Sequence, residues 1–301
     1  MATLYTHKDR NILKTWLFMV MFFAVVIGVG WAVSWYYRNT AILYVAVAFS
    51  VFMNVLSYWY SDTIVLRMAG ARPVDRESYR ELWNIIENLS IAAGLPMPRV
   101  YIINDPSPNA FATGRNHEHA VIAFTTGILH ILNRQELEGV AAHELSHIGN
   151  RDMLLSTVIV VLVGFVTIVS DMFLRMTFWG NSGRRSEGGR GGNQFTIIIA
   201  IVLIVLAPIA ATLMRLAISR KRELLADASG ALLTRYPEGL ASALEKISSV
   251  GIPLRKASNA TAHLYISDPF TKEQRAGFFE KLFMTHPPVI ERVAALRSGD
   301  Y

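Results

Sequence analysis

The sequence predicts a mainly α-helical protein with four transmembrane helices and a water-facing part that contains a small β-sheet. Hydrophobic residues make up 52% of the 301 residues and charged residues only 17%, which is too apolar for an ordinary soluble protein. Four apolar runs of about 20 residues are each long enough to cross a hydrocarbon core of about 30 Å. Between the second and third runs, two short stretches rich in β-branched and aromatic residues predict strands.

The first two apolar runs, 16–35 and 41–60, predict an N-terminal transmembrane hairpin within residues 1–62. A cleaved signal peptide is the alternative for the first run. The apolar region of a signal peptide is only about 7 to 15 residues long, however, and the aromatic residues that end this run are typical of a membrane interface. We therefore expect the first run to remain in the protein and to pair with the second.

The water-facing part is expected in two pieces, residues 63–152 and 215–301. The expected helices span 76–93, 222–233, 237–250 and 288–298, and the expected strands span 100–103 and 120–125. Gly94 and Pro96 stop the first helix. Residues 109–114 lie between the two strands, and an extended peptide can pair with the edge of such a small sheet through backbone hydrogen bonds.

The third and fourth runs, 153–174 and 195–214, predict a second transmembrane hairpin over residues 153–214, with a glycine-rich flexible loop at 180–192. An even number of spans puts both water-facing pieces on one side of the membrane. Only five of the 29 Lys and Arg residues lie in the connections on the other side, so the positive-inside rule places the water-facing pieces in the cytoplasm. Because three of those five belong to the glycine-rich loop, a shallow or cavity-lining hairpin is the alternative for this pair.

Residues 143–147, His-Glu-Leu-Ser-His, carry the pattern of a catalytic zinc site. In a helix, His143 and His147 lie on one face and can bind one metal ion, while Glu144 can take a proton from metal-bound water. Asn133 and Glu136 resemble a capping box at the start of that helix. The chain has no cysteine, so thiolate ligands and disulfides are excluded. The alternative is a surface helix with incidental histidines.

Such a site needs a third protein ligand and leaves the fourth position for water. Glu223 and Asp227 offer two carboxylates at i and i+4 on one face of a predicted helix. Glu223 can bind the metal while Asp227 accepts a hydrogen bond from the outer nitrogen of a ligand histidine. A solvated, charged helical turn after a membrane span is the alternative for this segment.

Taken together, these motifs resemble the HtpX-type bacterial membrane zinc metalloproteases, a family more distantly related to the eukaryotic CAAX prenyl proteases. The resemblance covers nearly the whole chain and includes the order of the four apolar runs. The matching segments are 109–112, 143–147, 149–152, 223–227 and 285–288 together with Arg292. The resemblance implies a zincin-like cytoplasmic metalloprotease domain in a multi-pass protein of the bacterial cytoplasmic (inner) membrane, with the active site on the cytoplasmic side.

The resemblance also implies roles for individual residues. The implied ligands of one Zn²⁺ per chain are His143, His147 and Glu223, with Glu144 as general base and Asp227 as the group that orients a ligand histidine. Asn109 and His286 are implied to flank the substrate carbonyl, where an amide and an imidazole can stabilise an oxyanion. The implied substrate contacts are Asn109, Ala110, Phe111, Ala112 and Arg292. For His286, a plain position at the start of a helix before two prolines is the alternative.

The function expected from this resemblance is a zinc endopeptidase that cleaves misfolded or damaged membrane proteins, in membrane protein quality control and the stress response. His147 precedes the third run by six residues and Glu223 follows the fourth by nine, at most about 9 and 14 Å of helix, so we expect the zinc close to the membrane surface. The alternatives are a catalytically silent zinc-containing membrane scaffold or transporter, and a prenyl-peptide protease. The basic residues flank apolar runs, so no nucleic-acid partner is expected despite the net charge of +6.

Overall fold

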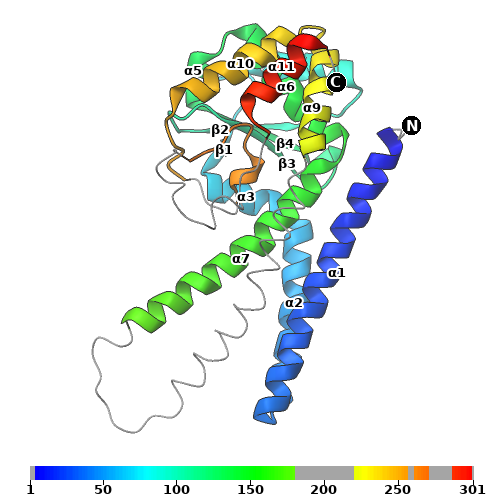
Figure 1. The fold of residues 1–301 in the computed structure, drawn as a ribbon, viewed down its shortest axis with the longest axis vertical. Helices are drawn as coiled ribbons and strands as arrows, with labels where there is room; N and C mark the ends of the chain where they lie inside the picture. Colours follow the sequence, from blue (N-terminus) through cyan, green and yellow to red (C-terminus); the bar gives the residue numbers. More distant parts are fainter. Residues whose placement is uncertain (1–3, 180–219, 257–260, 271–286, 300–301) are drawn as a thin grey trace.

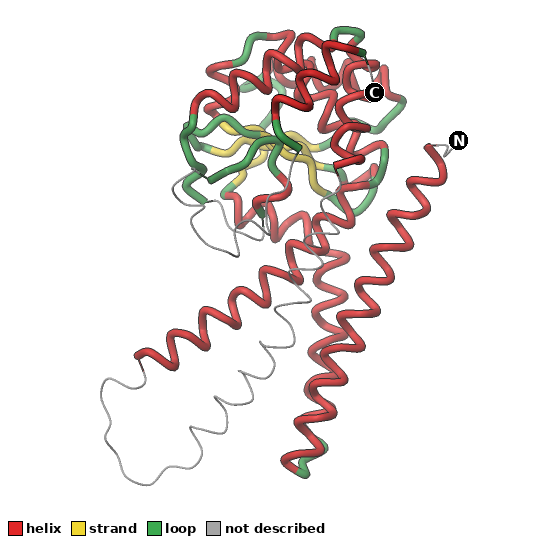
Figure 2. The backbone as a smooth tube through the Cα atoms, viewed as in Figure 1, coloured by secondary structure: helices red, strands yellow, loops and turns green. Residues whose placement is uncertain are grey.

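The computed structural model describes residues 4–179, 220–256, 261–270 and 287–299. Helices predominate in this part of the chain, beside one four-stranded sheet (Figure 2). Three predictions lie outside the described residues: the fourth span over 195–214, the glycine-rich loop and His286. The predicted mainly helical fold with a small sheet is confirmed.

The N-terminal hairpin consists of α1 (Leu4–Tyr37) and α2 (Ala41–Trp59), which pack side by side and project from the rest of the protein (Figure 1). Residues Ile12–Tyr37 and Ala41–Trp59 are both long and apolar enough to cross a membrane. Asn39 closes the turn between them, because its Oδ1 accepts a hydrogen bond of 3.0 Å from the Ala41 N–H. The first two predicted spans are therefore confirmed as candidate membrane helices.

The sheet has the order β1-β2-β4-β3. Its strands are β1 (Ala71–Pro73), β2 (Arg99–Ile103), β3 (Ala110–Thr113) and β4 (Val121–Thr125). The inner pair, β2 and β4, is parallel, and both outer strands are antiparallel to their neighbours. The two predicted strands are confirmed to within a residue. The segment expected between them contributes β3, which forms one edge of the sheet.

Helices cover one face of the sheet and enclose the main hydrophobic core. They are α4 (Arg80–Ala93), α5 (Thr126–Ile131), α6 (Arg134–Gly149), α9 (Arg220–Thr234), α10 (Pro237–Val250) and α11 (Val289–Ser298). The expected helices 222–233, 237–250 and 288–298 are found within two residues of their predicted bounds. The fourth, α4, begins four residues later than expected and ends, as expected, at Gly94 with a positive φ of 64°.

The third predicted span is a helix, α7 (Asp152–Trp179), but its first half lies inside the protein. It follows α6 after a bend of 84°. Residues such as Leu155, Val158 and Ile159 are fully buried against α1, α2, β3 and the short helix α3 (Ser61–Ala69). A helix that is apolar on all sides suits a protein core as well as a bilayer. Whether the second half of α7 crosses the membrane stays a prediction.

Candidate metal centre

Helix α6 carries both histidines, and a capping box fixes where it begins. Asn133 Oδ1 accepts a hydrogen bond from the Glu136 N–H, and Glu136 Oε2 accepts one from the Asn133 N–H. The predicted capping box is thus confirmed. Lys246 of α10 also donates to Glu136, at 2.8 Å. With its start fixed and its residues buried among α4, α9 and α10, the helix holds His143 and His147 on one face.

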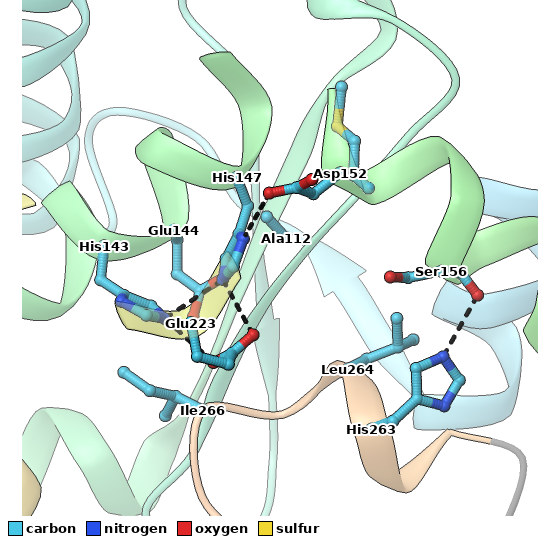
Figure 3. A pocket seen from close by; sticks show the side chains of 11 residues that line it. Ala112, His143, Glu144, His147, Asp152, Ser156, Glu223, His263, Leu264 and Ile266 are labelled. Atoms are coloured by element: carbon cyan, nitrogen blue, oxygen red, sulfur yellow. Dashed lines mark hydrogen bonds and ion pairs between the residues drawn. The ribbon is translucent and has the colours of Figure 1, made fainter. Parts of the chain in front are cut away.

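Three side chains from two helices converge at one point (Figure 3). The Nε2 atoms of His143 and His147 lie 3.2 Å apart. The Glu223 carboxylate of α9 lies 3.8 Å from His143 Nε2 through Oε2 and 3.7 Å from His147 Nε2 through Oε1. Ligand atoms of the three residues lie within 4.8 Å of one another. Two nitrogens bound to one tetrahedral zinc lie about 3.3 Å apart, so the group has the dimensions of a metal site.

The tautomers of the two histidines also favour a cation between them. His143 Nδ1 lies 2.9 Å from an Asp227 oxygen, and His147 Nδ1 lies 3.4 Å from an Asp152 oxygen. A carboxylate only accepts hydrogen bonds, so each Nδ1 carries a hydrogen. The two Nε2 atoms, which are the positions left for a metal ion, then face each other and Glu223. Two imidazole nitrogens and a carboxylate in that position suit a bound metal ion.

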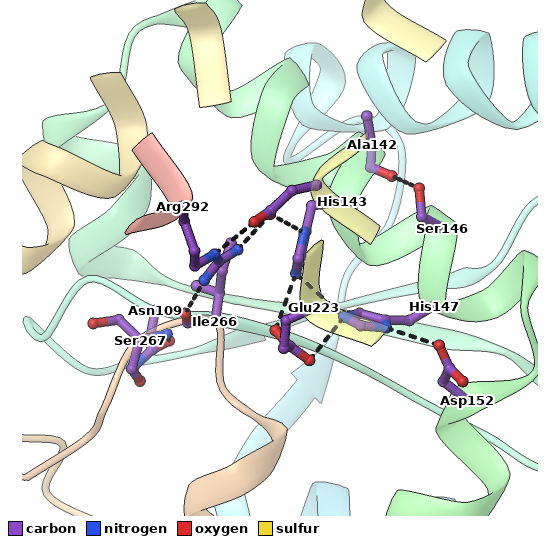
Figure 4. A network of polar contacts seen from close by, with 11 residues as sticks. Asn109, Ala142, His143, Ser146, His147, Asp152, Glu223, Ile266, Ser267 and Arg292 are labelled. Carbon is purple, nitrogen blue, oxygen red and sulfur yellow. Dashed lines mark hydrogen bonds and ion pairs between the residues drawn. The ribbon is translucent and has the colours of Figure 1, made fainter. Parts of the chain in front are cut away.

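Asp227, next to His143, forms a buried ion pair with Arg292. Figure 4 shows Arg292 and His143 in this network. Arg292 Nη2 and Nε donate to the two oxygens of Asp227 at 2.6 and 2.8 Å, and Nη1 donates to the Ile266 carbonyl. Burial acts to raise the pKa of Asp227, but Arg292 and His143 outweigh it and bring that pKa to about 2. Burial lowers the pKa of His143 to about 4, against the opposing effect of Asp227. Asp227 is therefore an acceptor and His143 a neutral imidazole at neutral pH.

Asp152, at the first position of α7, lies beside Nδ1 of His147, as Asp227 lies beside Nδ1 of His143. Burial acts to lower the pKa of His147, but Asp152, Glu223 and Glu144 outweigh it and raise that pKa to about 9. The sequence analysis noted Asp152 only as part of a matching segment and gave it no role. Its spacing of five residues from His147 could have pointed to it, had the bend between α6 and α7 been foreseen.

Glu144 is buried beside the three converging side chains and borders the same pocket. Burial raises its pKa to about 7, Glu223 adds to this, and His147 and a hydrogen bond from the Ala112 N–H oppose it. A carboxyl group with a pKa near 7 can both accept and release a proton at physiological pH. The arrangement provides an acid–base group next to a possible metal ion.

The pocket is walled by α6, α7, α9, β3 and the short helix η2 (Ala262–Leu264). Ala112 is the residue of β3 that lines it. His263, to which the sequence analysis gave no role, also lines the pocket, with its Nε2 3.3 Å from the Ser156 carbonyl oxygen. Met153 and Ser156 border the pocket from the first turns of α7. The pocket therefore lies against the helix that leaves the domain beside the membrane hairpin (Figure 1).

Several residues expected at the substrate contact other parts of their own chain. Asn109 donates through Nδ2 to the Ser267 carbonyl at 2.9 Å and accepts from the Ser267 N–H, so its amide binds residues of its own chain. The Ile266 N–H bonds to the Ala110 carbonyl, and Phe111 packs edge-on against Tyr265. Residues 265–267 thus run along the outer edge of β3 at its start.

Arg292, also expected at the substrate, is 1% exposed and directs its guanidinium at Asp227. A bidentate contact needs both partners in place, so Arg292 is engaged within the protein. Among the described residues that were expected to contact substrate, Ala112 lines the pocket. His286 lies outside the described residues.

The fold and the site together define the class of membrane metalloprotease. Two helices fit to cross a membrane carry a domain in which a His-His-Glu group, with His143 buried and His147 and Glu223 partly exposed, adjoins a carboxyl group that can act as a base. The chain belongs to peptidase family M48, whose family model matches residues 76–299.

Full-length relatives agree with this membership. The chain is 46% identical over 299 residues to the "Protease HtpX homolog" of Caldanaerobacter subterraneus subsp. tengcongensis, covering 98% of each. It is 46% identical over 286 residues to the protein of the same description from Pyrococcus furiosus, covering 94% of each. The crystal structure of S. mikatae Ste24p matches with a TM-score of 0.50 at 18% identity, covering 100% of this chain and 67% of that one, and shows a shared fold. The expected resemblance to HtpX-type proteases is confirmed.

Proposed function

We propose that this membrane protease is a zinc-dependent endopeptidase that cleaves misfolded or damaged membrane proteins at the cytoplasmic face of the bacterial inner membrane. The observation that carries the catalytic part is the orientation of the two histidines. Each directs its Nδ1 at a buried carboxylate and its Nε2 at the other histidine and at Glu223. The domain is zincin-like, and a second transmembrane hairpin over 153–214 separates its two parts, 63–152 and 215–301.

In this proposal His143, His147 and Glu223 hold one Zn²⁺. Bound zinc supplies Lewis-acid chemistry, which makes water more acidic and polarises a peptide carbonyl. Asp227 and Asp152 keep the two rings in the tautomer that leaves Nε2 free for the metal, and Arg292 keeps Asp227 ionised and in place. Glu144 accepts the proton of the attacking water and passes it to the leaving amine, a transfer that its raised pKa favours.

The substrate is proposed to bind in an extended form along the outer edge of β3. Residues 265–267 occupy that edge at Asn109 and Ala110, which leaves the stretch at Ala112 beside Glu144 for a substrate backbone. Backbone pairing selects extended chain rather than particular side chains, which fits unfolded segments as substrates. Asn109 then supports the substrate edge from behind by holding Ser267.

Polar residues in the described membrane helices favour this function over a transporter. The Ser50 and Ser57 hydroxyls donate to carbonyls of their own helix, α2, and so does the Asn54 amide. A transport path instead needs polar groups that face one another across helices. A prenyl-peptide protease and a silent zinc scaffold remain the competing outcomes of the experiment below.

The decisive experiment compares the purified full-length protein, loaded with zinc in detergent, with its Glu144→Gln variant on an unfolded model protein. We expect the variant to bind zinc as wild type does, by elemental analysis, and to lose about 10²- to 10⁴-fold in cleavage rate. Equal cleavage by the two proteins would remove Glu144 from the mechanism. No cleavage by either would favour the silent scaffold, and cleavage limited to a prenylated peptide would favour the prenyl-peptide protease.

A further inference from the structure

Aromatic side chains mark the level at which the N-terminal hairpin leaves the bilayer. Trp16 of α1 stacks on Tyr58 of α2, and Trp59 and Tyr60 next to it are more than half exposed. At the other end of the hairpin, Trp35 is also exposed. Trp16 and Trp35 are separated by about 28 Å of helix at 1.5 Å per residue, close to the thickness of a hydrocarbon core. The level of Trp59 is therefore a membrane interface, on the side of the catalytic domain.

The connection between β3 and β4 reaches this interface. Its Arg115 places the guanidinium carbon 4.4 Å from the centroid of the Trp59 ring, a cation–π contact. Gly114 makes the tight turn possible: its φ is 138°, and a Cβ there would lie 2.4 Å from the His119 carbonyl oxygen. The loop of residues 115–119 thus contacts the membrane hairpin through Arg115.

The side chain of Arg115 is held by uncharged groups. Its Nη2 lies 2.8 Å from His119 Nε2, and because a guanidinium only donates, His119 must accept there and carry its hydrogen on Nδ1. Asn116 Oδ1 fixes this tautomer by accepting from His119 Nδ1 and from the His119 N–H. In the described parts of the chain the ion pairs of the arginines do not include Arg115. Its positive charge is fixed in position at the interface but is not neutralised there.

We propose that Arg115, positioned by Trp59 and His119, binds the phosphate of an anionic phospholipid headgroup. A guanidinium offers five donors in a planar fork that suits two phosphate oxygens, and here it uses one of them on His119. The guanidinium lies level with the interfacial Trp59, at the depth where lipid phosphates lie. Glu118, exposed on the same loop, would repel a second anion and so favours a single headgroup.

The site has a consequence for the protease domain. Arg115 follows Ala112 by three residues, which is at most about 10 Å even for a fully extended chain. Ala112 lines the pocket beside the metal centre. A headgroup bound to Arg115 would thus hold the outer edge of β3 at the level of the bilayer surface. The proposal requires the N-terminal hairpin to lie in a membrane and does not depend on the substrates proposed above.

The test measures lipid binding directly. The full-length protein in detergent is titrated with phosphatidylglycerol or with phosphatidylcholine, and bound lipid is counted by native mass spectrometry. We expect saturable binding of phosphatidylglycerol to wild type, and about fivefold weaker binding to Arg115→Gln, the effect of one interfacial cation. Trp59→Leu should weaken binding similarly, whereas Trp59→Phe, which keeps a ring face, should not. Arg134→Gln, which removes an exposed arginine from α6, serves as the charge-matched control and should bind as wild type does.

Three results would overturn the proposal. The first is equal phosphatidylglycerol binding by wild type and by both Arg115→Gln and Trp59→Leu. The second is equal binding of phosphatidylcholine, which would show that the lipid charge has no part. The third is displacement of phosphatidylglycerol by an equal concentration of inorganic phosphate, which would assign the site to a free anion.

Discussion

At the scale of single residues, the most informative group is the buried pair of Arg292 and Asp227. Its two charges lie next to the candidate metal centre and are almost without solvent contact. Removing one partner of such a pair strongly destabilises the folded protein, because the other charge stays buried without compensation. The pair therefore makes the stability of the domain depend on the same residues that orient His143.

We expect Arg292→Met to lower the free energy of unfolding by about 3 to 5 kcal/mol and to raise the pKa of Asp227. Thermal unfolding in detergent measures the stability, with Arg134→Met as an exposed control that should change it by less than about 0.5 kcal/mol. If the variant instead kept wild-type stability and lost only peptide affinity, Arg292 would be a substrate-binding residue, as the sequence analysis expected.

The protonation of His147 predicts how zinc binding depends on pH. With a pKa raised to about 9, this ring holds a proton at neutral pH that a metal ion must displace. Each unit of pH below 9 should therefore weaken zinc binding about tenfold through this proton, and raising the pH towards 9 should restore it. Competition with a coloured chelator at pH 7, 8 and 9 measures the slope. Asp152→Asn removes the hydrogen-bonded group that raises the pKa of His147 most. In this variant the plot of zinc affinity against pH should therefore level off at a lower pH than in wild type. Identical plots for the two proteins would contradict the role of Asp152.

At the scale of elements, the site depends on how closely α9 approaches α6. Gly230 of α9 lies against the backbone of α6, where an added Cβ would be 3.0 Å from the His143 N. The same helix carries Glu223 and Asp227. A side chain at 230 must therefore push the third ligand away from the histidines. Gly139 plays a corresponding part on the other side of α6, where a Cβ would be 2.6 Å from the Leu240 N of α10.

We expect Gly230→Val and Gly139→Ala each to cost about 1 to 3 kcal/mol of stability through overpacking. Only Gly230→Val should also weaken zinc binding, because only the contact at 230 sets the distance between α9 and the histidines. Elemental analysis after dialysis against a weak chelator compares them. Equal zinc retention by the two variants would mean that Glu223 adjusts independently of α9.

The elements also show what could be read from the sequence. Helical spacing was enough to bring His143 and His147 to one face and to select Glu223, because these relations are local to one turn or follow from metal chemistry. The contacts of Arg292 and Asp152 could not be predicted because they are tertiary: Arg292 meets a partner 65 residues away, and Asp152 lies beyond an 84° bend. The short elements α3, α5 and β1 are too brief for a periodic pattern. For the first half of α7 the sequence cannot separate burial in protein from burial in lipid, because both select the same side chains.

At the scale of the whole molecule, the pocket borders α7, the helix that packs against the membrane hairpin. Ala112 is three residues, at most about 10 Å of chain, from Arg115, the residue that touches Trp59, and α7 borders the pocket with its first turns. The expectation of a metal centre near the membrane surface therefore gains support from contacts as well as from chain distances. A site in this position favours extended segments that begin at the bilayer.

We expect cleavage to depend on distance from the membrane. In a model substrate, one cleavable segment is moved stepwise away from a transmembrane helix by a rigid helical spacer, at about 1.5 Å per residue. The cleavage rate should be highest for short spacers and fall as the segment leaves the surface. The same segment inside a folded soluble domain is the control and should resist cleavage. A rate that does not change with spacer length would place the site in open cytoplasm.

The division of the metal centre between α6 and α9 also governs when activity can begin during synthesis. His143 and His147 leave the ribosome roughly 75 residues before Glu223, which at 5 to 20 residues per second takes about 4 to 15 s. Arg292, which holds Asp227 in place, follows roughly 70 residues later still. The nascent chain thus passes through the insertion machinery with two histidines and no complete centre. A protease made in this order cannot attack its own unfolded, half-inserted segments before α9 has been made.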